Sequence, residues 1–196
     1  MRAFRRFSVV STSSIVVVTA LAILSTAQTP QPTDKSSKIQ IKNFGCINEN
    51  LYRGAQPKER DYADLAAMGV KTIIDLQRDG KASEQGLVEA QGMKFYRIGM
   101  SDKNQPLTEQ AELFLKLVND PANQPVFVHC AGGRHRTGAM SAIYRITHDG
   151  WSADQAYQEM KRYDFEYGMG HGSLKNYVYA FYAQIEEKGL VVNSNK

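Results

Sequence analysis

The fold of this chain is decided by the stretch Val126-Phe127-Val128-His129-Cys130-Ala131-Gly132-Gly133-Arg134-His135-Arg136-Thr137-Gly138. Its apolar start predicts a buried strand, its paired glycines predict a turn, and residues 137–148 predict a helix that ends at Gly150. Cys130 is therefore expected at the carboxyl end of a central strand and at the entrance to a helix. Open α/β sheets bind their ligands at this position.

This loop is suited to hold an anion. A helix N-terminus offers unpaired N–H groups and the positive end of the helix dipole. Gly132 and Gly133 allow the backbone to curl so that successive N–H groups point inward. Such a site stabilises a thiolate on Cys130 and binds the three non-bridging oxygens of a phosphoryl group. Arg136, six residues after Cys130, can bind two of those oxygens through its planar guanidinium.

Strand-like and helix-like segments alternate on both sides of the loop. The expected strands are 51–53, 70–76, 95–98 and 126–129, and the expected helices are 58–68, 83–91, 108–120, 137–148, 152–163 and 174–188. Thr108 and Ser152 are the expected N-caps of two of these helices. The alternation predicts an α/β fold with a central, mostly parallel sheet of four to five strands flanked by helices on both faces.

The first residues have the features of a targeting segment. Arg2, Arg5 and Arg6 precede an apolar run over 15–24 and the small residues that end at Ala27. We expect 1–27 to be a cleaved signal peptide and the protein to be exported, to the periplasm or the medium. The alternative is an uncleaved membrane anchor through 7–24.

Behind the signal peptide, the chain divides into a linker, a domain and a tail. The linker is expected at 28–38, which is polar and contains two prolines, the catalytic domain at 39–190, and a flexible tail at 191–196. The segment 1–27 holds three arginines and no acidic residue, so 21 basic and 20 acidic residues remain, a net charge of +1. This balance argues against nucleic acid as a partner, and we expect a monomer.

Residues 129–138, together with 50–57 and 73–76, resemble the dual-specificity protein tyrosine phosphatases, and most closely their compact bacterial, plant and fungal branch. The resemblance extends over about residues 40–188. It implies that Cys130 is the nucleophile of a cysteinyl-phosphate mechanism and that Arg136 binds phosphate. It also implies that the Thr137 hydroxyl hydrogen-bonds the thiolate. Neither a metal nor a cofactor is expected.

The same resemblance implies an aspartate general acid on a separate loop upstream of the cysteine. Seven aspartates precede Cys130, and Asp102 is the main candidate because it directly follows a strand, in the loop 101–106. Asp102 can therefore lie at the same sheet edge as the cysteine. Asp79 is the second candidate, whereas Asp75 lies within a strand and is expected to anchor a neighbouring loop.

The remaining loop residues leave alternatives open. His129 is expected to be half-buried and to orient Cys130. Ala131, Gly132 and Gly133 complete the expected phosphate-binding set with Arg134 and His135, although these last two side chains could also be solvated charges.

The substrate is an open choice between a phosphorylated protein, another small phosphomonoester and an inositol polyphosphate. Relatives active on inositol polyphosphates often carry lysine where Arg134 stands, but Ala131 departs from some of them. A phosphate-binding pseudophosphatase and a sulfur transferase are the alternatives to a phosphatase.

Three further features have no firm role. Cys46, expected just before the first strand, is interpreted as a partly buried thiol or as a disulfide partner of Cys130 under oxidising conditions. His148 and His171 are interpreted as structural. The glycine-rich stretch 166–171 is a candidate for the rim of the pocket.

Overall fold

A computed structural model describes residues 39–166 and 170–189. The expected signal peptide, linker and tail lie outside the described residues. Within the described part, no helix has the length and apolar character needed to cross a membrane.

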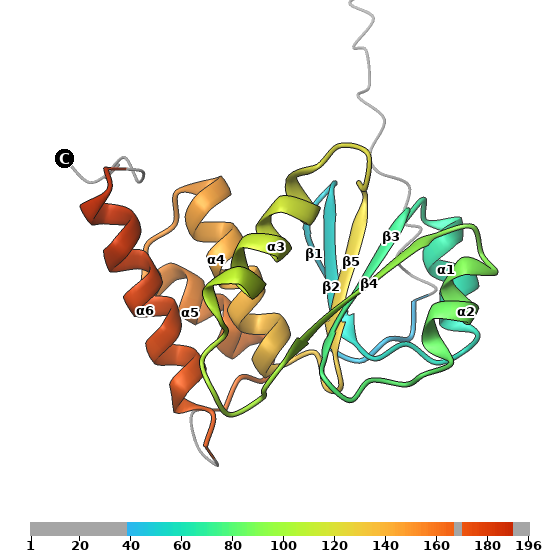
Figure 1. The fold of residues 1–196 in the computed structure, drawn as a ribbon, viewed down its shortest axis with the longest axis horizontal. Coiled ribbons are helices and arrows are strands. Elements are labelled where there is room, and N and C mark those ends of the chain that lie inside the picture. Colours follow the sequence, from blue (N-terminus) through green and yellow to red (C-terminus); the bar gives the residue numbers. More distant parts are fainter. Residues whose placement is uncertain (1–38, 167–169, 190–196) are drawn as a thin grey trace, which may run out of the picture. The chain divides into compact units, whose positions relative to one another are not determined.

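A five-stranded sheet forms the centre of the domain, in the order β1-β2-β5-β3-β4 (Figure 1). The strands are β1 (Gly45–Asn48), β2 (Leu51–Ala55), β3 (Thr72–Gln77), β4 (Lys94–Met100) and β5 (Val126–Cys130). All neighbours are parallel except β1 and β2. The predicted fold class is confirmed, and β5, which ends at Cys130, is the central strand.

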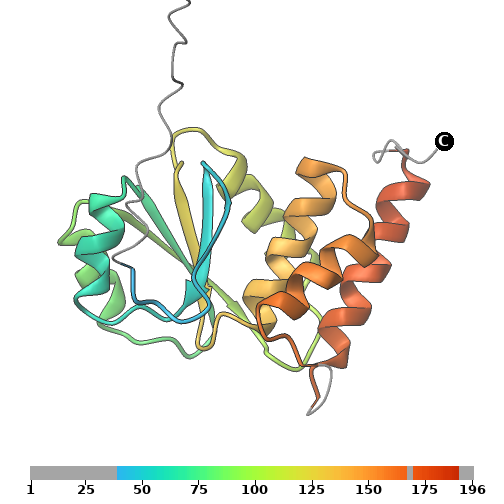
Figure 2. The same cartoon turned by 180° about the vertical axis from the view of Figure 1, so that it is seen from behind.

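Helices cover both faces of this sheet, as Figures 1 and 2 show from opposite sides. The helices are α1 (Asp61–Ala67), α2 (Glu84–Glu89), α3 (Thr108–Asn119), α4 (His135–Asp149), α5 (Ala153–Arg162) and α6 (Gly172–Glu187). The first two pack on one face, and the other four lie on the opposite side.

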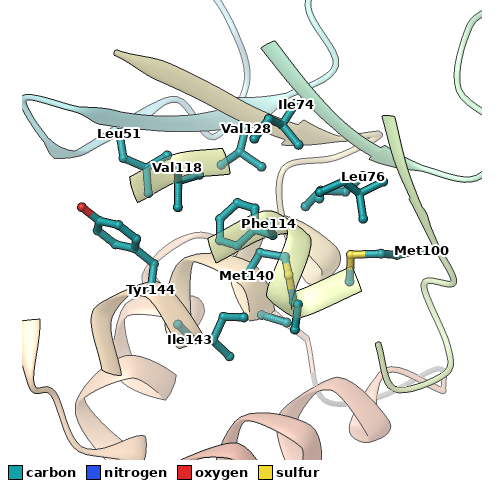
Figure 3. Close-up of a cluster of buried hydrophobic side chains, with 14 of the residues drawn as sticks. Leu51, Ile74, Leu76, Met100, Phe114, Val118, Val128, Met140, Ile143 and Tyr144 are labelled. Carbon is teal, nitrogen blue, oxygen red and sulfur yellow. The ribbon is translucent and has the colours of Figure 1, made fainter. Parts of the chain in front are cut away.

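Alternation along the central strands divides the apolar residues between two cores. Ile74 and Val128 point into the larger core, beneath α3 and α4, and Ile73 and Phe127 into the smaller one, beneath α1 and α2. In Figure 3, Phe114 lies between the strand residues and α4. A central strand buried on both faces holds its last residue, Cys130, in a fixed place.

Several predicted boundaries are corrected. The sequence interpretation missed β1, which is a short, partly exposed edge strand. Thr108 is the first residue of α3 rather than its cap, because the N-cap is Leu107, whose N–H donates to Gln110 Oε1 at 2.9 Å. The cap at Ser152 is confirmed, since its Oγ accepts from the Gln155 N–H at 3.3 Å.

Candidate active site

The loop 130–136 joins β5 to α4 and lines a cavity of about 200 Å³. The cavity is lined by Asp102, Cys130, Ala131, Gly132, Arg134, His135, Arg136 and His171. It therefore brings together the central strand, the start of α4, the loop after β4 and the residue before α6. The other expected loop residue, Gly133, is buried behind this wall.

A second cavity of similar volume adjoins the first and shares Asp102, Ala131 and Arg136 with it. The second cavity is lined by Gln77, Arg78, Asp79, Met100, Ser101, Asp102, Ala131 and Arg136. Arg136 is buried, with 8% of the residue exposed, and its Nη1 donates to the Met100 carbonyl at 3.3 Å. Its Nε has no partner among the described residues. The guanidinium is thus held in place with donor capacity left for a ligand.

Thr137 follows on the first turn of α4 and is fully buried. Its hydroxyl has no hydrogen-bond partner within the part of the chain that the structure describes.

His129 is also fully buried, so the expectation of a half-buried position was wrong. The reason is that α2 brings Glu84 against the central strand. His129 Nε2 lies 2.9 Å from Glu84 Oε1, and its Nδ1 lies 3.9 Å from Asp75 Oδ1.

Glu84 is the centre of a buried polar network behind the cysteine. Its Oε1 accepts from the Tyr62 hydroxyl at 2.7 Å and from Gln56 Nε2 at 2.8 Å. Burial alone would raise the pKa of Glu84, but its contacts with His129, Tyr62 and Gln56 outweigh burial and hold that pKa below its ordinary value. The network gives His129 a fixed anionic neighbour.

Asp75 extends the network to the neighbouring strand. Its Oδ1 accepts from the Gln77 N–H at 2.9 Å, and its Oδ2 accepts from Arg97 Nε at 2.8 Å. Asp75, Glu84 and His129 offer ligand atoms within 4.8 Å of one another. The Arg97 cation already contacts both carboxylates, which makes this cluster an ion-pair network rather than a fit for a metal ion.

Asp102 and Asp79 take different positions. Asp102 is exposed, follows β4 and lines both cavities, whereas Asp79 lines only the one without Cys130. The Asp102 loop is tied to the start of α6, because its backbone carbonyl contacts His171 Nδ1 at 2.8 Å and the Lys103 carbonyl accepts from the Ser173 hydroxyl. Of these two aspartates, Asp102 therefore shares a cavity with Cys130 and Asp79 does not.

His171, which the sequence analysis interpreted as structural, lines the cavity. Its ring stacks on His135 with the centroids 3.6 Å apart and the planes at 12°. Burial lowers the pKa of His135 to about 4, and His171 and Arg134 act in the same direction. Arg134 in turn lies 3.7 Å from Glu166. The one sequence signal was the glycine-rich stretch 166–171, of which His171 lines the cavity and Glu166 contacts Arg134.

Cys46 lies within β1, not before the first strand, and it is exposed. The register pairs Cys46 with Tyr52 and Tyr52 with Phe127, so Cys46 is two strands and three residues away from Cys130. Strand spacing places their Cα atoms about 14 Å apart, whereas a disulfide needs less than about 7 Å. Both thiols are free, and a Cys46–Cys130 bond does not fit this fold.

Comparison with known proteins agrees with this geometry. Residues 27–174 match the family described as "DSP-PTPase phosphatase fused to NAD+ Kinase". The chain belongs to this phosphatase family. It is a cysteine-dependent phosphomonoester hydrolase of the protein tyrosine and dual-specificity type, which acts through a cysteinyl-phosphate intermediate.

Individual relatives show how far the similarity extends. "Probable tyrosine-protein phosphatase DG1060" of Dictyostelium discoideum is 31% identical over 62% of this chain and 75% of its own length. "Inositol diphosphatase SIW14" of Saccharomyces cerevisiae is 29% identical over 65% of this chain, but the match spans only 47% of that protein. The crystal structure of P. aeruginosa TpbA in complex with pTyr shares the fold, with a TM-score of 0.62, 22% identity and coverage of 81% and 94% of the two chains.

Proposed function

We propose that Cys130 is the nucleophile and that residues 130–136 bind the transferred phosphoryl group. The Cys130 thiolate attacks phosphorus in line while the loop N–H groups and Arg136 bind the equatorial oxygens. As the bond between phosphorus and the leaving oxygen breaks, Asp102 donates a proton to that oxygen. His129 orients the cysteine from behind. The support for these roles is that Cys130, Asp102 and Arg136 line one cavity.

The second half of the reaction releases phosphate from the cysteine. The Asp102 carboxylate accepts a proton from a water molecule, whose oxygen bonds to phosphorus as the phosphorus–sulfur bond breaks. The sulfur leaves as a thiolate, which the Thr137 hydroxyl stabilises by a hydrogen bond. The enzyme returns to its starting state.

The variants Cys130→Ser, Asp102→Asn and Asp79→Asn test these assignments. Cys130→Ser is expected to abolish turnover, and full activity in it would refute the mechanism. Asp102→Asn is expected to lower kcat by about 100-fold or more on phosphotyrosine, and less on an aryl phosphate with a better leaving group. Asp79→Asn is the matched control, because Asp79 lines only the second cavity. If it loses more activity than Asp102→Asn, the general acid is Asp79.

The substrate we propose is a phosphorylated protein or a small phosphomonoester. The relatives named above include a structure in complex with pTyr and an inositol diphosphatase. The second candidate is an inositol polyphosphate, favoured by Arg78, Arg134 and Arg136 around the two adjoining cavities.

A panel of phosphotyrosine peptides and inositol polyphosphates, assayed with Arg134→Ala, separates the two. A rise in KM confined to the polyphosphates supports the second candidate. An equal, small effect on both classes supports the first.

We further propose that 1–27 is a bacterial export signal, that 28–38 is a linker, and that the mature enzyme acts as a monomer in the periplasm or medium. Arg2, Arg5, Arg6, the apolar run and Ala27 support export. The mass of the protein recovered from fractionated cells tests it, with Gln28 expected as the first residue. Full-length protein in the membrane fraction would instead support an anchor through 7–24.

A further inference from the structure

Three successive carbonyl groups of the loop each accept a hydrogen bond from a residue of the segment 43–56. Ala131 O accepts from the Gln56 N–H at 3.3 Å, Gly132 O from Asn43 Nδ2 at 2.8 Å, and Gly133 O from Arg53 Nη2 at 2.5 Å. A trans peptide carries its N–H opposite its C=O. Fixing these carbonyls on the side away from the cavity therefore turns the next three N–H groups, those of residues 132–134, toward it.

The donor to Gly133 is an unusual residue. Arg53 lies on β2 and is fully buried, and its guanidinium stacks on the Tyr163 ring at 3.9 Å. Its Nε and Nη1 have no partner among the described residues. Burial lowers the pKa of Arg53 to about 10, and Tyr163, Glu159 and, to a smaller extent, Cys130 oppose this shift.

A buried cation with a single hydrogen bond is costly unless an anion lies close by. The buried acid of α5, Glu159, is already bound by Arg145 at 2.8 Å. Among the described groups that act on Arg53, the Cys130 thiol is the one that becomes an anion in the loop, and a bound phosphoryl group would add a second negative charge there.

The backbone of the loop fits closely against the same strand. Gly133 has φ +66°, and a Cβ on it would lie 2.5 Å from Ala55 N and from the Gly54 carbonyl carbon. Asn43 itself has φ +53°, a conformation that asparagine tolerates better than most residues. At this contact, glycine and asparagine thus occupy the positions whose backbone conformation or close approach disfavours most other residues.

We propose that Asn43 and Arg53 are positioning residues, which hold the loop carbonyls outward so that its N–H groups face the phosphoryl group. The buried charge of Arg53 also favours the anionic forms of Cys130 and of the bound phosphate. This inference rests on the proposed role of the Cys130 loop, but it assigns a function to two residues outside that loop.

The charge of Arg53 is tested with Arg53→Met and Arg53→Lys. Arg53→Met removes the charge-assisted hydrogen bond to the Gly133 carbonyl, and we expect it to raise the inhibition constant of inorganic phosphate about tenfold. We also expect the pH midpoint of Cys130 alkylation by iodoacetamide to shift upward. Arg53→Lys is expected to restore that midpoint, because it keeps the charge. If Arg53→Met has the wild-type midpoint and phosphate inhibition, the proposal is wrong.

The orientation of the loop is tested at Asn43. Asn43→Gly removes the amide but tolerates the positive φ, and Asn43→Asp places a carboxylate oxygen against the Gly132 carbonyl. We expect weaker phosphate inhibition in both, more so in Asn43→Asp. These variants also carry the test if Arg53→Met does not fold. Wild-type inhibition in both Asn43 variants would refute the positioning role of this residue.

Arg145→Met is the matched control for a purely structural effect. Arg145 also stacks on an aromatic ring, Trp151, at 4.3 Å, but it lies near the far end of α4. It is expected to lower Tm without changing phosphate inhibition or the alkylation midpoint. If Arg53→Met behaves like this control, Arg53 only stabilises the fold. Activity in Cys130→Ser, by contrast, would refute the proposed function itself.

Discussion

At the scale of single residues, Glu84 is a carboxylate outside the loop 130–136 that contacts the residue preceding it and contributes to stability. It is fully buried and lies 2.9 Å from His129, the residue before the cysteine. Since the pKa of Glu84 is held below its ordinary value, its charge stabilises the fold above the unfolded-state pKa of about 4.3. That contribution is lost as the pH falls through the lower folded-state pKa.

Glu84→Gln is therefore expected to lower the free energy of unfolding by about 1.5–3 kcal/mol at pH 7, the usual value for a hydrogen bond to a charged group. The difference from wild type should shrink toward pH 3. Urea denaturation at both pH values measures it. Glu89→Gln, on the same helix but exposed, is the control and should change little. A difference that stays constant with pH would contradict the assigned pKa shift.

Gly133→Ala is a second prediction at this scale. A Cβ at this position meets backbone atoms of Gly54 and Ala55, which cannot rotate away, and the positive φ adds about 1–2 kcal/mol. We expect loss of both stability and phosphatase activity, measured by thermal melting and turnover of an aryl phosphate. Gly86→Ala in α2 is the control, since its Cβ would meet no atom within 4 Å, and it should stabilise the helix slightly. Wild-type activity in Gly133→Ala would show that the loop can move away from β2.

At the scale of elements, the start of α4 meets the start of α6 through the stacked rings of His135 and His171. Burial, His171 and Arg134 together lower the pKa of His135 to about 4, while Glu166 and Asp102 act weakly in the opposite direction. Between about pH 6.5, the ordinary value for histidine, and pH 4, the unfolded chain binds a proton that the folded chain does not. The contribution of His135 to stability therefore falls as the pH is lowered through this window.

Wild type is thus expected to lose more in Tm between pH 7 and pH 5 than His135→Asn, which has no group to titrate at this position. Thermal melting of both proteins at the two pH values makes the comparison. Equal losses would mean that His135 takes up a proton in the folded protein as readily as in the unfolded chain.

At the scale of the whole molecule, strand order determines whether the two thiols can form a disulfide. Because β2 lies between β1 and β5, Cys46 cannot reach Cys130 without unfolding the sheet edge. We expect wild type and Cys46→Ser to lose activity at the same rate under peroxide and to recover equally with reductant. Protection of the wild type alone, with an intramolecular disulfide detected by mass, would contradict this topology.

At this scale, part of the fold and of the site could be predicted from the sequence, and part could not. The strand, the cysteine, the glycines and Arg136 form one contiguous segment, and the alternating elements around it predict the parallel sheet and its central strand. The edge strand β1 was missed because its four residues have no strong apolar alternation. His129 was expected to be half-buried because the sequence does not show that α2 packs against it.

The sequence by itself determined the groups that lie close together along the chain: a thiol, an anion-binding turn and a guanidinium at fixed spacing. Only the tertiary structure decided which residues from distant parts of the chain contact them. Asn43 and Arg53 contact the loop from 89 and 80 residues away, and His171 meets Asp102 across 69 residues. Local spacing follows from backbone geometry, whereas these contacts depend on strand order and helix packing, which are properties of the whole chain.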